Sequence, residues 1–156
     1  MSMETVFETK LSWPADANQA KPPALDYSRN SIVNGVEKAE IRASAPSGFG
    51  GDDTGYNPEE LMLMSLSQCH MLTFLAVAAR AKITVLAYED RATGNLYKAP
   101  NGKAQLEKVL LQPRVIVPKG TDLGLLQLLH EKAHVNCFMA NSVNFPVHCE
   151  AIGIEQ

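Results

Sequence analysis

A long apolar segment, residues 58–80, constrains the fold of this chain more than any other feature. Asn57 is suited to cap a helix, and Pro58 suits its first position. Glu60 falls three residues after the cap, which completes a capping-box pattern. These signals predict one long helix that ends near residue 80.

The interior of this helix is apolar on every side. Leu61 to Ala79 contain no Asp, Glu, Lys or Arg, and the segment is long enough to span a bilayer. Ser67 and His70 near its middle disfavour a membrane span. Helices that are apolar all round are also found buried inside proteins, so we expect this one to be buried in a folded chain or a dimer.

The composition predicts one domain over residues 1–156, with 46% hydrophobic residues to supply its core. The net charge is −3, from 14 basic and 17 acidic residues, and no block of like charge is present. This argues against nucleic acid or a membrane surface as a partner. The first residues carry no basic region followed by an apolar one, so we expect no secretory signal and a cytoplasmic protein.

The rest of the chain reads as strands, loops and one further long helix. Asn34-Gly35 and Asn101-Gly102 are strong hairpin signals, and Thr121 or Asp122 is suited to cap the second helix. The predicted strands are 3–13, 25–33, 36–44, 83–98, 103–117 and 147–155, the loops are 15–23 and 45–56, and a short helix is predicted at 137–143. This order predicts an α+β domain.

Three cysteines are too few for a disulfide framework, and in a reducing compartment they are expected to be free, catalytic or metal-bound. Cys69 lies deep in the first helix, where the helix dipole does not lower a thiol pKa. A reactive Cys69 therefore needs a cation from elsewhere in the fold. Arg29 is the first candidate and Arg42 the second.

Cys137 follows Asn136, which we interpret as the N-cap of the short helix. A helix N-terminus favours a thiolate, so local chemistry predicts that Cys137 is the more acidic thiol. Cys149 lies on the last predicted strand beside His148, and a structural role in the core is expected for it.

Residues 56–72 (YNPEELMLMSLSQCHML) and 133–147 (AHVNCFMANSVNFPV) resemble the OsmC/Ohr family of hydroperoxide reductases. The shared elements are the Asn-Pro-Glu-Glu-Leu opening, a Cys on the following helix and a later Ala-His-x-x-Cys. Two positions depart from the Ohr-type pattern: Phe138 stands where Pro is common, and Arg29 lies in a Tyr-Ser-Arg context rather than a Gly-rich one.

The resemblance implies an OsmC-like fold, in which antiparallel sheets surround a central helix and two chains form an intertwined homodimer with composite sites. It implies that Cys69 is the peroxidatic cysteine and Cys137 the resolving one, with Glu59 and Arg29 completing the site. The implied substrate is an organic hydroperoxide, and the implied reductant is a dithiol, lipoyl-type in related proteins. The Cys69–Cys137 disulfide would be transient.

Glu59 and Cys69 lie ten positions apart on one helix, which corresponds to about 15 Å along its axis. One straight helix cannot bring the two side chains into one site. Antiparallel helices in a dimer would bring Glu59 of one chain toward Cys69 of the other. We therefore expect Glu59 to act across the interface.

Two other functions remain open at this point. His130, His134 and Cys137 have a spacing that could hold a metal, with His148 and Cys149 completing the set. A non-catalytic protein could instead bind an apolar ligand in a pocket near Cys69; its candidate lining residues are Met64, Met71, Leu72 and Phe74. No phosphate-cradling glycine motif is present, so no nucleotide, flavin or haem cofactor is expected.

Overall fold

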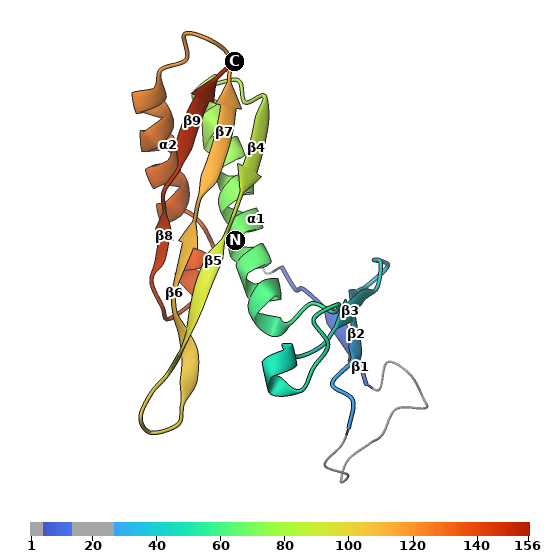
Figure 1. The fold of residues 1–156 in the computed structure, drawn as a ribbon. Coiled ribbons are helices and arrows are strands. Elements are labelled where there is room, and N and C mark those ends of the chain that lie inside the picture. The colour runs from blue at the N-terminus through green and yellow to red at the C-terminus, as the bar shows by residue number, and fades with distance from the viewer. Residues whose placement is uncertain (1–4, 14–26) are drawn as a thin grey trace. The chain divides into compact units, whose positions relative to one another are not determined.

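The computed structural model describes residues 5–13 and 27–156 (Figure 1). It divides into two units, Met1–Leu61 and Met62–Gln156, which are described separately. The loop predicted at 15–23 lies outside the described residues, as do the first residues of the strands predicted from 3 and from 25. That residues 1–156 form one domain stays a prediction.

The first unit contains an antiparallel sheet with the order β1-β2-β3. Its strands are β1 (Thr9–Ser12), β2 (Ser31–Gly35) and β3 (Ile41–Ala43), followed by a short 3₁₀ turn, η1 (Ser47–Phe49). The hairpin turn predicted at Asn34-Gly35 is displaced. Both residues are paired with β1, and the chain turns two residues later, where Glu37 has a φ of 56°. Pairing with β1 keeps Asn34 and Gly35 extended.

The long helix α1 (Pro58–Arg80) has the predicted start and end. Asn57 Oδ1 accepts from the Glu60 backbone N–H at 2.8 Å, and Glu60 Oε2 accepts from the Asn57 N–H at 3.1 Å. This reciprocal pair is the predicted capping box. Among the described residues, α1 is the one helix long and apolar enough to cross a membrane, a property that core helices of other proteins share.

The buried residues of α1 form one stripe, while much of its remaining surface is exposed although it is apolar. Leu66, His70, Phe74, Val77 and Ala78 are buried at helical spacing. The exposed large apolar side chains of this helix are Met62, Met64 and Leu72.

The second unit holds two mixed three-stranded sheets, with the orders β4-β7-β9 and β5-β6-β8. The strands are β4 (Ala87–Asp90), β5 (Thr93–Lys98), β6 (Ala104–Leu111), β7 (Pro113–Val117), β8 (Val147–Cys149) and β9 (Ile152–Glu155). Each of the three long strands predicted after residue 82 is thus divided into two. The turn predicted at Asn101-Gly102 is confirmed, and Gly102 has a φ of 84°.

A hydrogen bond marks one of these divisions. Gln112, between β6 and β7, donates its backbone N–H to Asp90 Oδ1 at 2.7 Å, where β4 gives way to β5. The pairs β4·β7 and β5·β6 are antiparallel, while β8 and β9 add to them in parallel. The last segment of the chain therefore edges both sheets.

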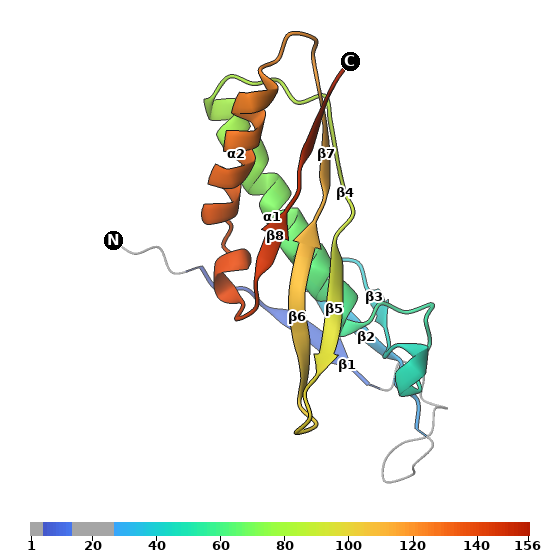
Figure 2. The same ribbon diagram turned by 60° about the vertical axis from the view of Figure 1, so that its left-hand side comes forward.

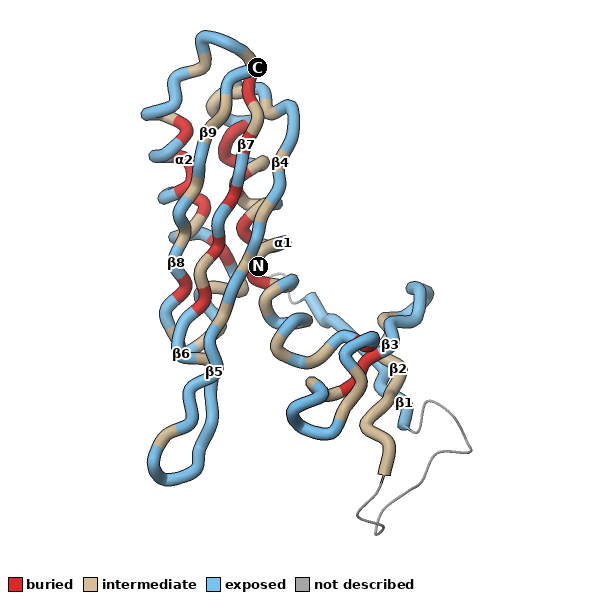
Figure 3. The backbone as a smooth tube through the Cα atoms, viewed as in Figure 1, coloured by how far each residue is buried: buried red, intermediate tan, exposed pale blue. Residues whose placement is uncertain are grey.

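The second helix, α2 (Leu123–Val135), is capped by Asp122, whose side chain accepts from the Leu125 N–H at 3.0 Å. Figure 2 shows α1 and α2 on the same side of the strands. Phe74 of α1, Val115 of β7 and Leu126 of α2 belong to one buried core, and the buried stretches are drawn red in Figure 3. A second core joins Leu66 to β6 and β8.

Candidate functional site

Cys69 and Cys137 lie together in the second unit. Cys69 is half-buried on α1, and Cys137 is 1% exposed directly after α2. The Met139 backbone N–H donates to Cys69 Sγ at 3.5 Å, and it also favours the thiolate of Cys137. Both sulfurs therefore interact with the Met139 N–H and lie against the same short stretch of chain. Both cysteines are free thiols.

The predicted acidity of Cys137 is wrong. Asn136 is the C-cap of α2 and donates its side-chain amide to the Lys132 carbonyl at 2.7 Å, so no helix begins at Cys137. The predicted helix at 137–143 is a 3₁₀ turn, η2 (Ala140–Ser142). Burial raises the pKa of the Cys137 thiol, opposed by the N–H of Ala140 and reinforced by the neighbouring Cys69.

Arg29 lies in the first unit beside a groove of about 630 Å³. Its guanidinium stands 4.4 Å from the centre of the Tyr27 ring and donates to the Tyr27 carbonyl at 2.9 Å. The apolar part of the groove lining includes Leu11, Trp13 and Val33. This arrangement places a permanent cation at the wall of an apolar groove.

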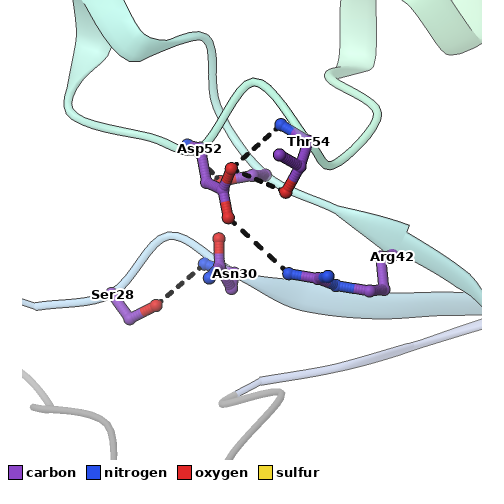
Figure 4. Close-up of polar contacts among 6 residues, drawn as sticks. Ser28, Asn30, Arg42, Asp52 and Thr54 are labelled. Carbon is purple, nitrogen blue, oxygen red and sulfur yellow. Dashed lines mark hydrogen bonds and ion pairs between the residues drawn. The ribbon is translucent and has the colours of Figure 1, made fainter.

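Arg42 has a different environment. Its guanidinium forms an ion pair with Asp52 at 3.6 Å, and its side chain is 65% exposed (Figure 4). Hydrogen bonds from Thr54 lower the pKa of Asp52, so this carboxylate remains charged. Arg42 is thus paired with a carboxylate, whereas Arg29 contacts the Tyr27 ring and carbonyl; a functional role for either arginine stays a prediction.

Glu59 lies in the first turn of α1, next to the capping residue Glu60. Its Oε2 atom is buried and has no hydrogen-bond partner among the described residues. A buried carboxylate oxygen without a partner is unusual and calls for an explanation. Glu59 and Arg29 belong to the first unit and the two thiols to the second. That all four meet in one site stays a prediction.

A second cluster in the second unit consists of His70, His130 and Cys149. His70 Nε2 lies 3.2 Å from His130 Nδ1 and 3.4 Å from Cys149 Sγ. Among the described residues this is the one His/Cys/Asp/Glu group with metal-binding spacing, so the set predicted from His130, His134 and Cys137 is wrong. The spacing of His130 and His134 on one helix did not reveal that the histidine in contact with His130 is His70, which lies on α1.

The environment of this cluster keeps its groups neutral. Burial lowers the pKa of His70 and of His130 to about 4, and it raises the pKa of Cys149 to about 12. His70 is fully buried, and Phe74 stacks on His130 with 3.9 Å between ring centres. In the sequence, His70 stands between Leu66 and Phe74 at spacings of four residues, so a histidine within an apolar stripe was the available signal.

The apolar pocket predicted around Met64, Met71, Leu72 and Phe74 is not formed by these residues together. Phe74 is fully buried in the core, whereas Met64 and Leu72 are exposed on α1. An apolar groove is present instead in the first unit, beside Arg29.

The second unit thus has two mixed sheets, two helices, and a half-buried cysteine on the long helix close to a buried cysteine after the second helix, which makes this an α+β protein with a pair of neighbouring thiols. Residues 50–151 match the family model of OsmC-like proteins. The chain belongs to the OsmC-like family, as the resemblance predicted.

Solved structures agree with this assignment. An OsmC-like protein of unknown function from Vibrio cholerae O1 biovar eltor is 32% identical, with a TM-score of 0.84 over 96% of this chain and 100% of that chain. An organic hydroperoxide resistance protein from Elizabethkingia anophelis, with thiocyanate bound, is 23% identical, with a TM-score of 0.72 over the whole of both chains.

The chain is also similar in sequence to the uncharacterized protein YmaD of Bacillus subtilis, which is 22% identical over 88% of this chain and 85% of that protein.

Proposed function

We propose that this protein is a thiol-dependent peroxidase that reduces organic hydroperoxides to alcohols in oxidative or osmotic stress defence. The observation that carries the proposal is the proximity of Cys69 and Cys137, whose sulfurs both interact with the Met139 N–H. Family membership supports it, because organic hydroperoxide resistance proteins share this fold.

The reaction has three balanced steps. The Cys69 thiolate attacks one oxygen of the O–O bond, the bond breaks, and the other oxygen leaves as an alcohol after taking a proton. Cys69 becomes a sulfenic acid. The Cys137 thiol then attacks the sulfenic sulfur, water leaves, and a disulfide forms. A dithiol reductant, which is lipoyl-type in related proteins, returns two electrons and two protons to the pair.

Arg29 and Glu59 complete the proposed site. Arg29 supplies the cation that stabilises the Cys69 thiolate, and the apolar groove beside it receives the organic part of the hydroperoxide. The Glu59 of the site belongs to a second chain. Contact between the two chains would give the buried Oε2 atom of Glu59 a hydrogen-bond partner. The proposed assembly is therefore a homodimer, and the proposed compartment is the cytoplasm, where a dithiol reductant is available.

The test compares the unmodified protein with three cysteine variants in a hydroperoxide consumption assay, with dihydrolipoamide as reductant and cumene hydroperoxide as substrate. We expect Cys69→Ser to lose at least about 100-fold in kcat/KM, since it lacks the nucleophile. Cys137→Ser should consume peroxide but accumulate a sulfenic acid at Cys69, detected with a sulfenic-acid-selective probe and mass spectrometry.

The matched control is Cys149→Ser, which removes a thiol outside the proposed redox pair. If Cys69→Ser and the unmodified protein reduce cumene hydroperoxide equally, the peroxidase proposal fails. The groove beside Arg29 then favours an alternative, a protein that binds an apolar ligand without turnover. Such a protein would bind a fluorescent fatty acid equally well with or without Cys69.

A further inference from the structure

The geometry points to a metal-binding function at the histidine–cysteine cluster: we propose that His70, His130 and Cys149 bind one thiophilic transition-metal ion, Zn²⁺ or Cu(I). The site lies outside the proposed redox pair, and the proposal does not depend on peroxidase activity. It would tie together α1, α2 and β8, each of which supplies one ligand.

The distances fit coordination. In a tetrahedral zinc site, bond lengths of about 2.1 Å to nitrogen and 2.3 Å to sulfur place neighbouring ligand atoms roughly 3.3–3.6 Å apart. His70 Nε2 lies 3.2 Å from His130 Nδ1 and 3.4 Å from Cys149 Sγ. The third pair of ligand atoms, on His130 and Cys149, lies within 4.8 Å. Two of the three separations therefore match those of a coordinated set, and the third lies within 4.8 Å.

The hydrogen bonds of the two imidazole rings do not offset the whole free-energy cost of burying their nitrogens. Both rings are almost fully buried, at 0% exposure for His70 and 2% for His130. One hydrogen bond can join their inner nitrogens, but His70 Nδ1 and His130 Nε2 have no partner among the described residues. Unpartnered buried polar atoms cost free energy. A metal bound by the inner nitrogens provides binding free energy that offsets this cost.

The chemistry of the ligands selects the ion. Imidazole and thiolate are borderline and soft donors, which suit Zn²⁺ and Cu(I) rather than Mg²⁺ or Ca²⁺. Coordination removes the Cys149 proton, which is released to solvent, because a bound cation reverses the effect of burial on a thiol.

A cavity beside the cluster provides access and has room for either ion. A cavity of about 280 Å³ is lined by His130, His148 and Cys149. It has room for a water molecule, which Zn²⁺ would take as its fourth ligand. Cu(I) needs no fourth ligand, and with one thiolate it forms a site without net charge. Shape alone therefore admits both ions, and the experiment separates them.

The test uses Cys69→Ser/Cys137→Ser protein, which removes the other dithiol and leaves Cys149 as its one cysteine. The reduced protein is titrated with Zn²⁺, and separately with Cu(I), each against a chromophoric competing chelator. We expect one ion per chain, a rise in Tm on binding, and X-ray absorption spectra with two nitrogen ligands and one sulfur. A water oxygen should appear for Zn²⁺ only.

Cys149→Ser in the same background should weaken binding by more than about 100-fold, since loss of a ligand exceeds the 10–100-fold effect of losing a supporting residue. His130→Gln should do the same, with circular dichroism to confirm folding. The control is Lys132→Gln, which changes an exposed residue of α2 that does not line this cavity and should leave the affinity unchanged. Failure of both ions to bind at one per chain, or equal affinity after Cys149→Ser, would overturn the proposal.

Discussion

Burial differs between the two thiols of the proposed redox pair. Cys69 is half-buried, whereas Cys137 is almost completely buried and its pKa is raised. A peroxidatic thiol must reach its substrate, but a resolving thiol needs only to reach the neighbouring sulfur. The greater exposure of Cys69 therefore agrees with the roles that the family resemblance implies. The raised pKa of Cys137 is opposite to the low pKa expected from a helix start at this residue.

The raised pKa of Cys137 predicts how stability depends on pH. Below the pKa of the unfolded chain, near 8.5, the thiol is protonated in both states and contributes no pH dependence. Above it the unfolded chain releases the proton while the folded protein keeps it. The free energy of unfolding should then fall by up to about 1.4 kcal/mol per pH unit from this group.

The measurement is urea unfolding of the reduced protein and of Cys137→Ala between about pH 7 and pH 10. The two curves should be offset at neutral pH by the cost of the substitution, and the variant should lose less stability as the pH rises. Parallel curves over the whole range would show that Cys137 ionises equally in both states.

Single residues also show how far the sequence predicts local structure. Asn57, Glu60 and Asp122 occupy their predicted capping positions, because a cap depends on groups within one helical turn. Asn136 could cap either the end of one helix or the start of another. Its side chain turns back to Lys132, a choice that depends on how the chain leaves α2.

The two long helices were predicted closely, whereas the short helix at 137–143 and the division of the strands were not. The strands predicted at 83–98, 103–117 and 147–155 are correct as extended segments, but each is shared between two sheets. Alternation of side chains shows that a segment is extended and does not show which neighbour it pairs with. For the same reason, the partner β1 displaced the turn expected at Asn34-Gly35.

The contact between β9 and α2 gives a prediction about packing. A Cβ atom on Gly153 would lie 2.6 Å from Leu126 Cδ2 and 3.0 Å from Leu123 Cδ2. Because Leu126 is fully buried, its side chain has little room to move. Gly153→Ala should therefore destabilise the protein by about 1–3 kcal/mol, the usual cost of overpacking.

Chemical denaturation of Gly153→Ala and of Gly48→Ala tests this. A Cβ atom on Gly48 meets nothing within 4 Å, so that variant should lie within about 0.5 kcal/mol of the unmodified protein. Equal destabilisation by the two variants would mean that the close approach of β9 to α2 is not what limits residue 153.

The whole molecule has an apolar helix that one chain covers only in part. Of the most apolar window of α1, 28% is buried, and Met62, Met64 and Leu72 are exposed. Exposed apolar surface of this kind marks an interaction surface. Helix α1, the long apolar segment, thus has two faces. His70 and Phe74 lie on the inner one, and the other is available to a second chain.

Charge placed on the exposed face of α1 should therefore separate the proposed dimer. Leu72→Glu is expected to shift the mass measured by light scattering from that of two chains to that of one, because the carboxylate would be buried without a partner. Leu128→Glu, at an exposed leucine of α2, should leave the mass unchanged. Retention of the same mass by both variants would place the interface elsewhere.

The Oε2 atom of Glu59 is buried and has no partner within residues 5–13 and 27–156, which is explained if a second chain uses it. Glu59→Ala and Cys69→Ser are each expected to be inactive as homodimers. In a mixed dimer, Glu59 from the Cys69→Ser chain can meet Cys69 from the Glu59→Ala chain, so one of the two sites is intact. Random exchange makes half of the dimers mixed, which should restore about a quarter of normal peroxidase activity.

The mixture is refolded together so that the chains exchange, and its activity is compared with that of the two variants refolded separately and then combined. Action of Glu59 within its own chain predicts no recovery in either sample, because no chain would carry both residues. The geometry of α1 favours action of Glu59 on the Cys69 of the other chain. Ten positions of uninterrupted helix hold Glu59 about 15 Å from the Cys69 of its own chain along the axis. A reacting peroxide cannot bridge that distance, but a second antiparallel helix can.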